Sequence, residues 1–316
     1  MVTPSVKYFL LDVALSFNQP KFCPTPVWNP NGITFANRTT VDEDPINIFV
    51  DTNNTVYITS GQSNKIFVWF NDSIHPTKII SGDFSTPESI FVTNNADIFI
   101  ANGVSEYRVD KWISNTNTTV TVMNTIEYCL SIFVDINDTL YCSMKEYHQV
   151  VKRWLNENLT TTTVVAAGTG FWGSGSNELQ HPFGIFVDVN FDLYVADCGN
   201  DRIQLFQSGQ LNGTTVVGVS SSNPTISLSR PSGIVLDADK YLFIVDSDNH
   251  RIIRSGPNGF QCVVGCSERG SQSNQLLMPK TLSFDSYGNM FVSDVENKRI
   301  QKYLFLEKCC GKLKVV

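Results

Sequence analysis

The segment from Pro182 to Phe206, PFGIFVDVNFDLYVADCGNDRIQLF, constrains the fold of this chain more than any other stretch. It contains three short apolar runs separated by polar turns, a pattern that predicts three consecutive antiparallel strands. A unit of this size cannot bury both of its faces by itself, so it must stack on other units of the same kind. The sequence supplies five further copies.

The copies are evident when they are aligned on the apolar residue at the centre of the first strand. This residue recurs every 42 to 53 positions, at Ile48, Ile90, Ile132, Ile185, Ile234 and Leu282. Runs rich in Thr and Val between the copies suit a fourth, outer strand; they begin at Thr118, Thr160 and Thr214. Four strands in each of six units predict an all-β fold, a six-bladed β-propeller with four-stranded antiparallel blades.

The ring needs one more strand to close. The last copy ends at Tyr303, whereas GITFAN at Gly32 to Asn37 resembles an outer strand and has no blade before it. We therefore expect this N-terminal strand to complete the last blade, which removes a free edge. The alternative is KLKVV at Lys312 to Val316. The predicted organisation is an N-terminal segment over residues 1–27, a propeller over residues 28–303 and a tail over residues 304–316.

Three segments resemble the NHL repeat, in which an apolar strand is followed by Asp, a short turn with Asn, and Arg-Ile. They are DCGNDRIQLF from Asp197, DSDNHRIIR from Asp246 and DVENKRIQKY from Asp294. The resemblance extends over residues 28–303 and implies a six-bladed propeller. In the first three copies the motif has decayed, since the Asp position is occupied by Ser60, Asn102 and Met144.

The Asp and Arg of this motif have a structural interpretation. An Asp at the end of the second strand can accept N–H groups of the turn and pair with the Arg five residues later. The expected bracing pairs are Asp197 with Arg202, Asp246 with Arg251, and Asp294 with Arg299. Because the pattern repeats, we assign these residues to the scaffold and not to catalysis.

The composition limits the class of protein. With 316 residues, 42% apolar and 17% charged, the chain has enough core material for one domain and little sign of disorder. A net charge of −7 without a basic block disfavours a partner recognised through phosphates. No apolar run is long enough to span a membrane, and Tyr8 to Phe17 after Lys7 is at most a weak or truncated signal peptide.

The eight cysteines are an even number, which permits disulfides. Cys262 and Cys266 lie on a predicted strand, where four residues span about 13 Å, too far for one bridge unless the strand ends between them. Cys142 is expected to be a small buried hydrophobic residue. A bridge from Cys23 to either residue of the pair Cys309–Cys310 would join the two ends. No CxxC pair is present to indicate a zinc site.

The loops predict two faces of different character. Links from strand one to two and from three to four share one face, and they carry the candidate glycosylation sites Asn53, Asn71, Asn117, Asn137, Asn158 and Asn212. Of the seven Asn-x-Ser/Thr sequences, only that of Asn37 follows an outer strand. Asparagine is also a common turn residue, so the number alone is weak support for secretion. The distribution predicts one face shielded by any glycans and the other open.

The open face carries the long loops Gly168 to Pro182 and Gly265 to Pro279. These loops match neither a phosphate loop nor a dinucleotide fingerprint. The groups expected to meet a ligand on this face are aromatic and imidazole side chains, namely Tyr147, His148, Trp172, His181 and His250. Trp172 could instead cover the core.

Three functions compete on this scaffold. The three histidines in successive blades invite comparison with peptide-amidating lyases, which are NHL-like propellers with a zinc centre, but the cysteine-rich signatures of those enzymes are absent. Some NHL propellers bind single-stranded RNA, yet this chain is acidic. We therefore predict a monomeric, non-enzymatic binding module for a protein or small ligand, without metal or cofactor. We expect it in the secretory pathway or outside the cell, with the cytoplasm as the alternative location.

Overall fold

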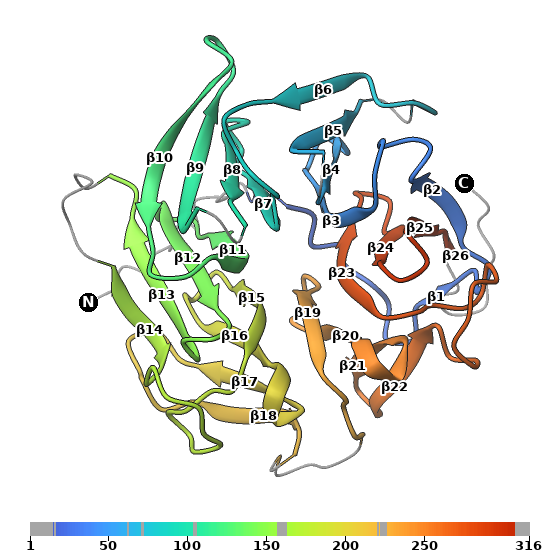
Figure 1. Cartoon of the computed structure of the whole chain (residues 1–316). Coiled ribbons are helices and arrows are strands. Elements are labelled where there is room, and N and C mark those ends of the chain that lie inside the picture. The colour runs from blue at the N-terminus through green and yellow to red at the C-terminus, as the bar shows by residue number, and fades with distance from the viewer. Residues whose placement is uncertain are drawn as a thin grey trace, which may run out of the picture.

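The computed structural model describes residues 15, 17–61, 63–70, 73–103, 106–156, 163–219, 221 and 226–306. The chain forms six four-stranded antiparallel sheets arranged as the blades of a propeller (Figure 1), which confirms the predicted fold class. The helical segments of the described residues are two short 3-10 turns, η1 (Cys198–Asn200) and η2 (Ser247–Asn249). None of the described segments is a helix of the length and apolarity needed to cross a bilayer.

Blades one to three each use four consecutive strands. Blade one contains β3 (Pro45–Val50), β4 (Val56–Ser60), β5 (Lys65–Trp69) and β6 (Lys78–Ser81). Blade two contains β7 (Ser89–Val92), β8 (Ile98–Ala101), β9 (Arg108–Ile113) and β10 (Thr118–Asn124). Blade three contains β11 (Cys129–Val134), β12 (Thr139–Met144), β13 (Gln149–Trp154) and β14 (Val164–Gly168).

Blades four and five repeat this order, and blade six departs from it. Blade four contains β15 (Pro182–Val187), β16 (Leu193–Asp197), β17 (Arg202–Phe206) and β18 (Thr214–Gly218). Blade five contains β19 (Pro231–Leu236), β20 (Leu242–Asp246), β21 (Arg251–Gly256) and β22 (Gly259–Val264). Blade six contains β23 (Pro279–Phe284), β24 (Met290–Asp294), β25 (Arg299–Tyr303) and β2 (Ile33–Asn37).

The burial pattern explains why these strands are apolar without strict alternation. Each second strand, such as β4 or β16, lies inside its blade and is buried along its whole length, because neighbouring blades cover both of its faces. The outer strands are mostly exposed or half-buried. The innermost strands contact one another around the whole ring. The core therefore lies between blades, as the stacking argument requires.

The N-terminal strand closes the ring, as predicted. β2 pairs with β25 from Ile33 opposite Lys302 to Asn37 opposite Arg299. Figure 1 shows β2 at the outer edge of the last blade, next to β25. A second, shorter pairing joins β1 (Val27–Trp28) to β26 (Phe305–Leu306). The alternative closing segment at the C-terminus lies outside the described residues.

Residues 17–28 form a strap that crosses from the axis of the propeller to its closing blade. The Phe17 ring packs edge-on against Phe133 and Phe186, with centroids 5.3 Å away in each case. Further along, Phe22 packs against the rings of Trp28 and Phe243 at 5.0 and 5.6 Å. The described part of the predicted N-terminal segment is thus packed on the propeller.

Two disulfides lie among the described residues, and one corrects the sequence analysis. Cys142 is not a free hydrophobic residue, because it is bonded to Cys129 with Cα atoms 5.3 Å apart. The register of β11 shifts between Cys129 and Ser131, which brings the Cys129 side chain toward the neighbouring strand. Cys262 and Cys266 are also bonded, which is possible because β22 ends at Val264, between them.

Of the cysteines predicted to connect the two ends of the chain, only Cys23 lies within the described residues. Cys23, within the strap, is disulfide-bonded. The expected partners Cys309 and Cys310 lie outside the described residues. Cys198, at the start of η1, is a free and buried thiol.

Candidate functional site

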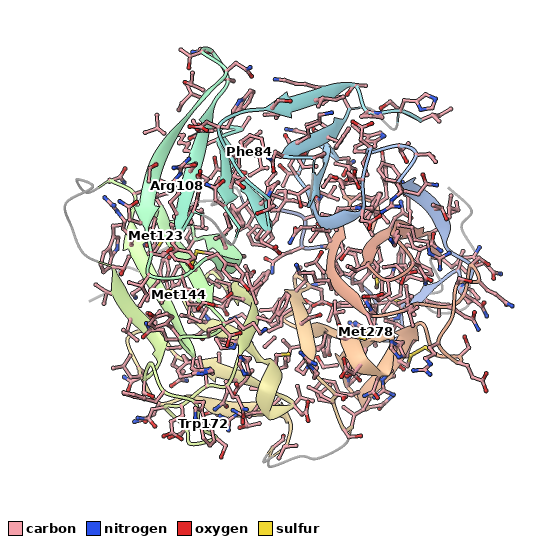
Figure 2. All side chains as sticks on the ribbon, in the orientation of Figure 1. Phe84, Arg108, Met123, Met144, Trp172 and Met278 are labelled. Carbon is pink, nitrogen blue, oxygen red and sulfur yellow. A yellow bond between two sulfur atoms is a disulfide. The ribbon has the colours of Figure 1, made fainter. Side chains whose placement is uncertain are left out.

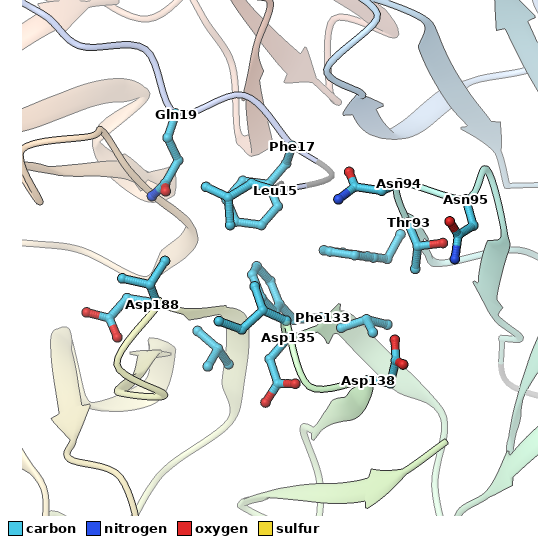
Figure 3. A pocket seen from close by; sticks show the side chains of 15 residues that line it. Leu15, Phe17, Gln19, Thr93, Asn94, Asn95, Phe133, Asp135, Asp138 and Asp188 are labelled. Atoms are coloured by element: carbon cyan, nitrogen blue, oxygen red, sulfur yellow. The ribbon is translucent and has the colours of Figure 1, made fainter. Parts of the chain in front are cut away.

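A central channel lies on the propeller axis, between two different faces. We call the face with the links between strands one and two the closed face, and the opposite one the open face. The channel is a cavity of about 100 Å³ lined by the six innermost strands and by Phe17. On the closed face, a second cavity of about 210 Å³ lies beside the strap, between Leu15, Gln19 and the turns that carry Asp135 and Asp188 (Figure 3). The strap therefore obstructs the channel from the closed face.

The three predicted bracing pairs have the same geometry. Arg202 Nε donates to Asp197 Oδ2 at 2.7 Å, and the corresponding distances are 2.8 Å for Arg251 with Asp246 and 2.7 Å for Arg299 with Asp294. The three carboxylates are fully buried. Burial raises the pKa of Asp197 and of Asp294, while the hydrogen bonds they accept act in the opposite direction.

Each carboxylate also holds the loop that enters its own blade. Oδ1 of Asp197 accepts the backbone N–H of Gln180 at 2.6 Å, and Oδ1 of Asp246 accepts that of Ser229 at 2.8 Å. The partner arginine extends this contact, because Arg202 donates to the carbonyl oxygens of Ser174, Gly175 and Glu178. In this geometry one buried carboxylate connects turn, strand and loop, as a bracing role requires.

Two of the three blades with a decayed motif use other polar side chains for the same purpose. In blade two, Asn102 accepts the N–H of Ser85, and its amide and Arg108 both donate to Asp110 on the third strand. In blade three, buried Glu127 accepts the backbone N–H groups of Glu146 and Tyr147, and burial raises its pKa.

Two of the predicted binding histidines make hydrogen bonds between blades. Nδ1 of His148 accepts the N–H of His181 at 3.2 Å, and Nδ1 of His250 accepts the N–H of Met278 at 3.1 Å. In the same position, Asn64 Oδ1 accepts the N–H of Thr86. The residues on both sides of these contacts have a positive φ, which turns the backbone N–H toward the neighbouring turn.

This use of Nδ1 decides the state of the imidazole. Nδ1 of His148 accepts a hydrogen bond and therefore carries no proton, so the neutral ring of His148 is the form that fits. Burial and the neighbouring His181 lower the pKa of His148, against the opposing effect of Glu146. His148 and His181 lie with ring centroids 4.9 Å apart, whereas His250 contacts a different loop. Within the described ranges, no group of three or more His, Cys, Asp and Glu side chains is arranged to hold a metal ion.

The two predicted aromatic anchors lie at different places. Tyr147 is 43% exposed beside His148 on the turn between the second and third strands of blade three. Trp172 is 71% exposed and lies at the outer edge of the molecule (Figure 2). Trp172 neither covers the core nor lines the channel cavity. The structure thus places Tyr147 next to His148, whose ring contacts that of His181, and Trp172 at the outer edge of the molecule.

The loop that carries Trp172 has a counterpart two blades further on. In both loops an arginine of the bracing motif donates to three carbonyl oxygens, and a leucine, Leu179 or Leu276, is fully buried. The exposed pair Phe171–Trp172 corresponds to Glu268–Arg269 in the second loop. The fold of this loop therefore does not depend on aromatic residues at its tip.

The glycosylation candidates are only partly separated from these loops. Asn53, Asn117, Asn137 and Asn212 are exposed, and the remaining pair, Asn71 and Asn158, lies outside the described residues. Asn212 departs from the expected separation of the faces, because the long loop folds along blade four and Ser176 Oγ reaches Asn212 Oδ1 at 3.4 Å. The carbonyl of Ser176 also accepts the N–H of Gly213.

Sequence reasoning missed two features. One is a second repeated carboxylate, exemplified by Asp188 Oδ1, which accepts the N–H groups of Asn190 and Asp192 in the link after the first strand. The recurring run IFVD was its signal. The other is the ion pair of Lys280 with Glu88, 3.0 Å apart at the open end of the channel. It left no sequence signal, because the two residues are 192 positions apart.

Comparisons with known proteins support the architecture. Neither a protein-family model nor a curated protein matches the sequence. The structure is similar to an auxiliary nutrient binding protein from Bacteroides ovatus, with 14% identity over 93% of this chain and 76% of that chain and a TM-score of 0.65. A gluconolactonase from Xanthomonas campestris shares 11% identity over 90% and 96% of the two chains, with a TM-score of 0.63.

A virginiamycin B lyase from Staphylococcus aureus is also similar, with 14% identity, coverage of 85% and 97%, and a TM-score of 0.56. These proteins include binders and enzymes. Identities this low establish the six-bladed propeller alone, since unrelated functions share such folds.

Proposed function

We propose that this protein is an NHL-like propeller that acts as an extracellular binding module and meets its ligand on the open face. The observation that carries this proposal is the asymmetry of the channel. Phe17 obstructs the end on the closed face, whereas the other end faces the side of the propeller that carries Tyr147, His148 and His181. A structural neighbour that is itself an auxiliary nutrient binding protein supports the choice of binding over catalysis.

The size of the channel argues for recognition at its mouth. Its volume of about 100 Å³ is below the roughly 300–1,000 Å³ of pockets that enclose drug-sized ligands. A ligand of that size must therefore lie on the open face, with at most a small group entering the channel. Tyr147, an exposed aromatic side chain next to a fixed turn, is suited to be a contact residue.

The zinc-enzyme alternative lacks the arrangement that it needs. His148 and His250 already use Nδ1 for hydrogen bonds between blades, and they contact different loops. The RNA alternative is weakened because Arg202 and Arg299, cations of this face, are bound to buried carboxylates and loop carbonyls. A secreted location is supported by the disulfides Cys129–Cys142 and Cys262–Cys266, which persist in oxidising compartments.

A crosslinking experiment tests the face. A photoreactive phenylalanine derivative is placed at Tyr147 or, as a matched control, at Tyr287, which is 65% exposed in a turn of the closed face. Adducts from extracts of the producing cells are expected at position 147 and not at 287. The partner so identified must then bind the purified protein, with Tyr147→Arg weakening binding and Tyr287→Arg leaving it unchanged. Adducts confined to position 287 would reverse the assignment of the faces.

A further inference from the structure

One position in the repeat places side chains at the open end of the channel. In each innermost strand, it is the residue immediately before the first one that lines the channel. The six residues are Ile46, Glu88, Leu130, Phe183, Ser232 and Lys280. In most blades the register of the strand shifts here. Such a shift redirects a side chain away from the regular pleat.

Three of the six residues have ordinary packing roles. Ile46 lies against Gly61 of its own blade, and Leu130 is buried. Ser232 donates to the carbonyl oxygen of Lys280 at 2.9 Å, which ties blade five to blade six. None of these roles requires a charge. The fold therefore tolerates an uncharged residue at this position.

The other three residues come from alternate blades and meet over the channel. Lys280 Nζ lies 3.0 Å from Glu88 Oε2 and 5.3 Å from the centroid of the Phe183 ring. The adjacent residues Ser89 and Thr281 line the channel cavity. The ion pair thus lies at the end of the channel opposite Phe17, with an aromatic ring beside it.

The pair is too buried to be explained as a surface salt bridge. The side chains of Lys280 and Glu88 are only 16% and 19% exposed. Removing two charges from water is costly, and an apolar pair of similar volume is often as stable or more stable. Since other blades place Ile, Leu or Ser here, stability does not account for the two charges.

We propose that Lys280, Glu88 and Phe183 form a site for a small zwitterion of the amino-acid type. The ligand carboxylate would take the place of Glu88 beside the ammonium of Lys280, and the ligand ammonium would pair with the freed Glu88. An apolar side chain of the ligand would contact the Phe183 ring. In this arrangement each charge keeps an opposite partner when the ligand enters, so the exchange avoids an unpaired buried charge.

The test compares three ligands that differ only in charge. Calorimetry of the full chain with L-leucine, N-acetyl-leucine and leucinamide is expected to show binding of leucine. Each derivative should bind at least about tenfold more weakly, because each lacks one charge-assisted contact. Equal affinity for the three compounds, or no binding of leucine, would overturn the proposal.

Substitutions then assign the binding to these residues. Lys280→Met and Glu88→Gln are each expected to weaken leucine binding at least about tenfold. Lys65→Met is the matched control, since Lys65 forms an exposed ion pair with Asp42 on the same face at 2.8 Å. The combined Glu88→Gln and Lys280→Met variant leaves no unpaired charge, so it should keep the melting temperature and still fail to bind leucine. Undiminished binding by that variant would contradict the site.

This inference rests on the proposed binding role of the open face, but different experimental results would contradict the two proposals. Crosslinking at Tyr147 without leucine binding would overturn the zwitterion site and leave the binding role standing. Leucine binding that is lost in the combined variant, together with crosslinks only at Tyr287, would support this site and move the larger partner to the closed face.

Discussion

Replacing Asp246 by Ala tests whether the repeated Asp–Arg motif holds the fold together. The substitution removes the acceptor for three donors, namely the N–H of Ser229, the amide of Asn249 and the guanidinium of Arg251. Arg251 is 26% exposed and can turn toward water, so its contribution is discounted. The N–H of Ser229 is partly buried, so the loss of its acceptor costs more free energy. We expect a loss of about 2–3 kcal/mol in the free energy of unfolding.

The structure supplies a control in the same turn. Asp248 lies two residues from Asp246, and its buried Oδ1 has no hydrogen-bond partner. Asp248→Ala should therefore change stability by less than about 0.5 kcal/mol. Asp246→Asn should lie between the two, because it keeps one acceptor oxygen and presents an amide group to the other donors.

Urea denaturation followed by tryptophan fluorescence measures these differences, and thermal melting provides a second measure. For a domain of this size, the expected loss for Asp246→Ala corresponds to roughly 3–5 °C in the melting temperature. The reasoning is refuted if Asp246→Ala and Asp248→Ala unfold at the same urea concentration. Loss of ligand binding in Asp246→Ala without loss of stability would instead show that the motif belongs to the binding site.

Three further predictions address the ring closure, His148 and the disulfide between Cys129 and Cys142. Deleting residues 1–37 removes the strap and β2, so the exposed edge of β25 should cause association, measured by light scattering; a monomer with an unchanged melting curve would contradict this. The lowered pKa of His148 means that its contribution to stability is present above the unfolded pKa of about 6.5 and is lost as the pH falls below it. His148→Asn, which supplies the acceptor found at Asn64, should therefore reduce the loss of stability between pH 7.5 and 5.5; an unchanged pH dependence would exclude His148 as its source. Replacing Cys129 and Cys142 together by Ser should lower stability by about 2–4 kcal/mol and abolish the destabilising effect of a reductant on this blade; a double variant as stable as the parent would argue against the bond.

The repeated parts of the chain could be predicted because six similar units constrain one another. Any single apolar run, such as that around Ile90, is ambiguous, but its recurrence at Ile132 and Ile234 fixes both its type and its place. The same argument placed β2 correctly, since one blade lacked an outer strand. The bracing geometry of Asp197 with Arg202 followed from residue chemistry and a separation of five.

The unrepeated parts could not be predicted in this way. Phe17 lies in a segment without a counterpart elsewhere in the chain, so nothing in the sequence indicated that its ring enters the channel. The bond of Cys142 to Cys129 depends on a shift in strand register that the pattern of residues does not show. The contact of Lys280 with Glu88 depends on ring closure, which brings together residues from blades two and six.

The pairing of β2 with β25 also determines the order in which the protein can be completed during synthesis. Thr34 and Gln301, which are hydrogen-bonded in the closed ring, are 267 residues apart in the chain. At about 5–20 residues per second, the ribosome needs roughly 13–53 s between making the first and the second. Throughout that interval β2 has no partner strand and the growing stack of blades has two open ends. A cell that makes this protein must therefore keep an incomplete ring from associating with its neighbours until the last blade emerges.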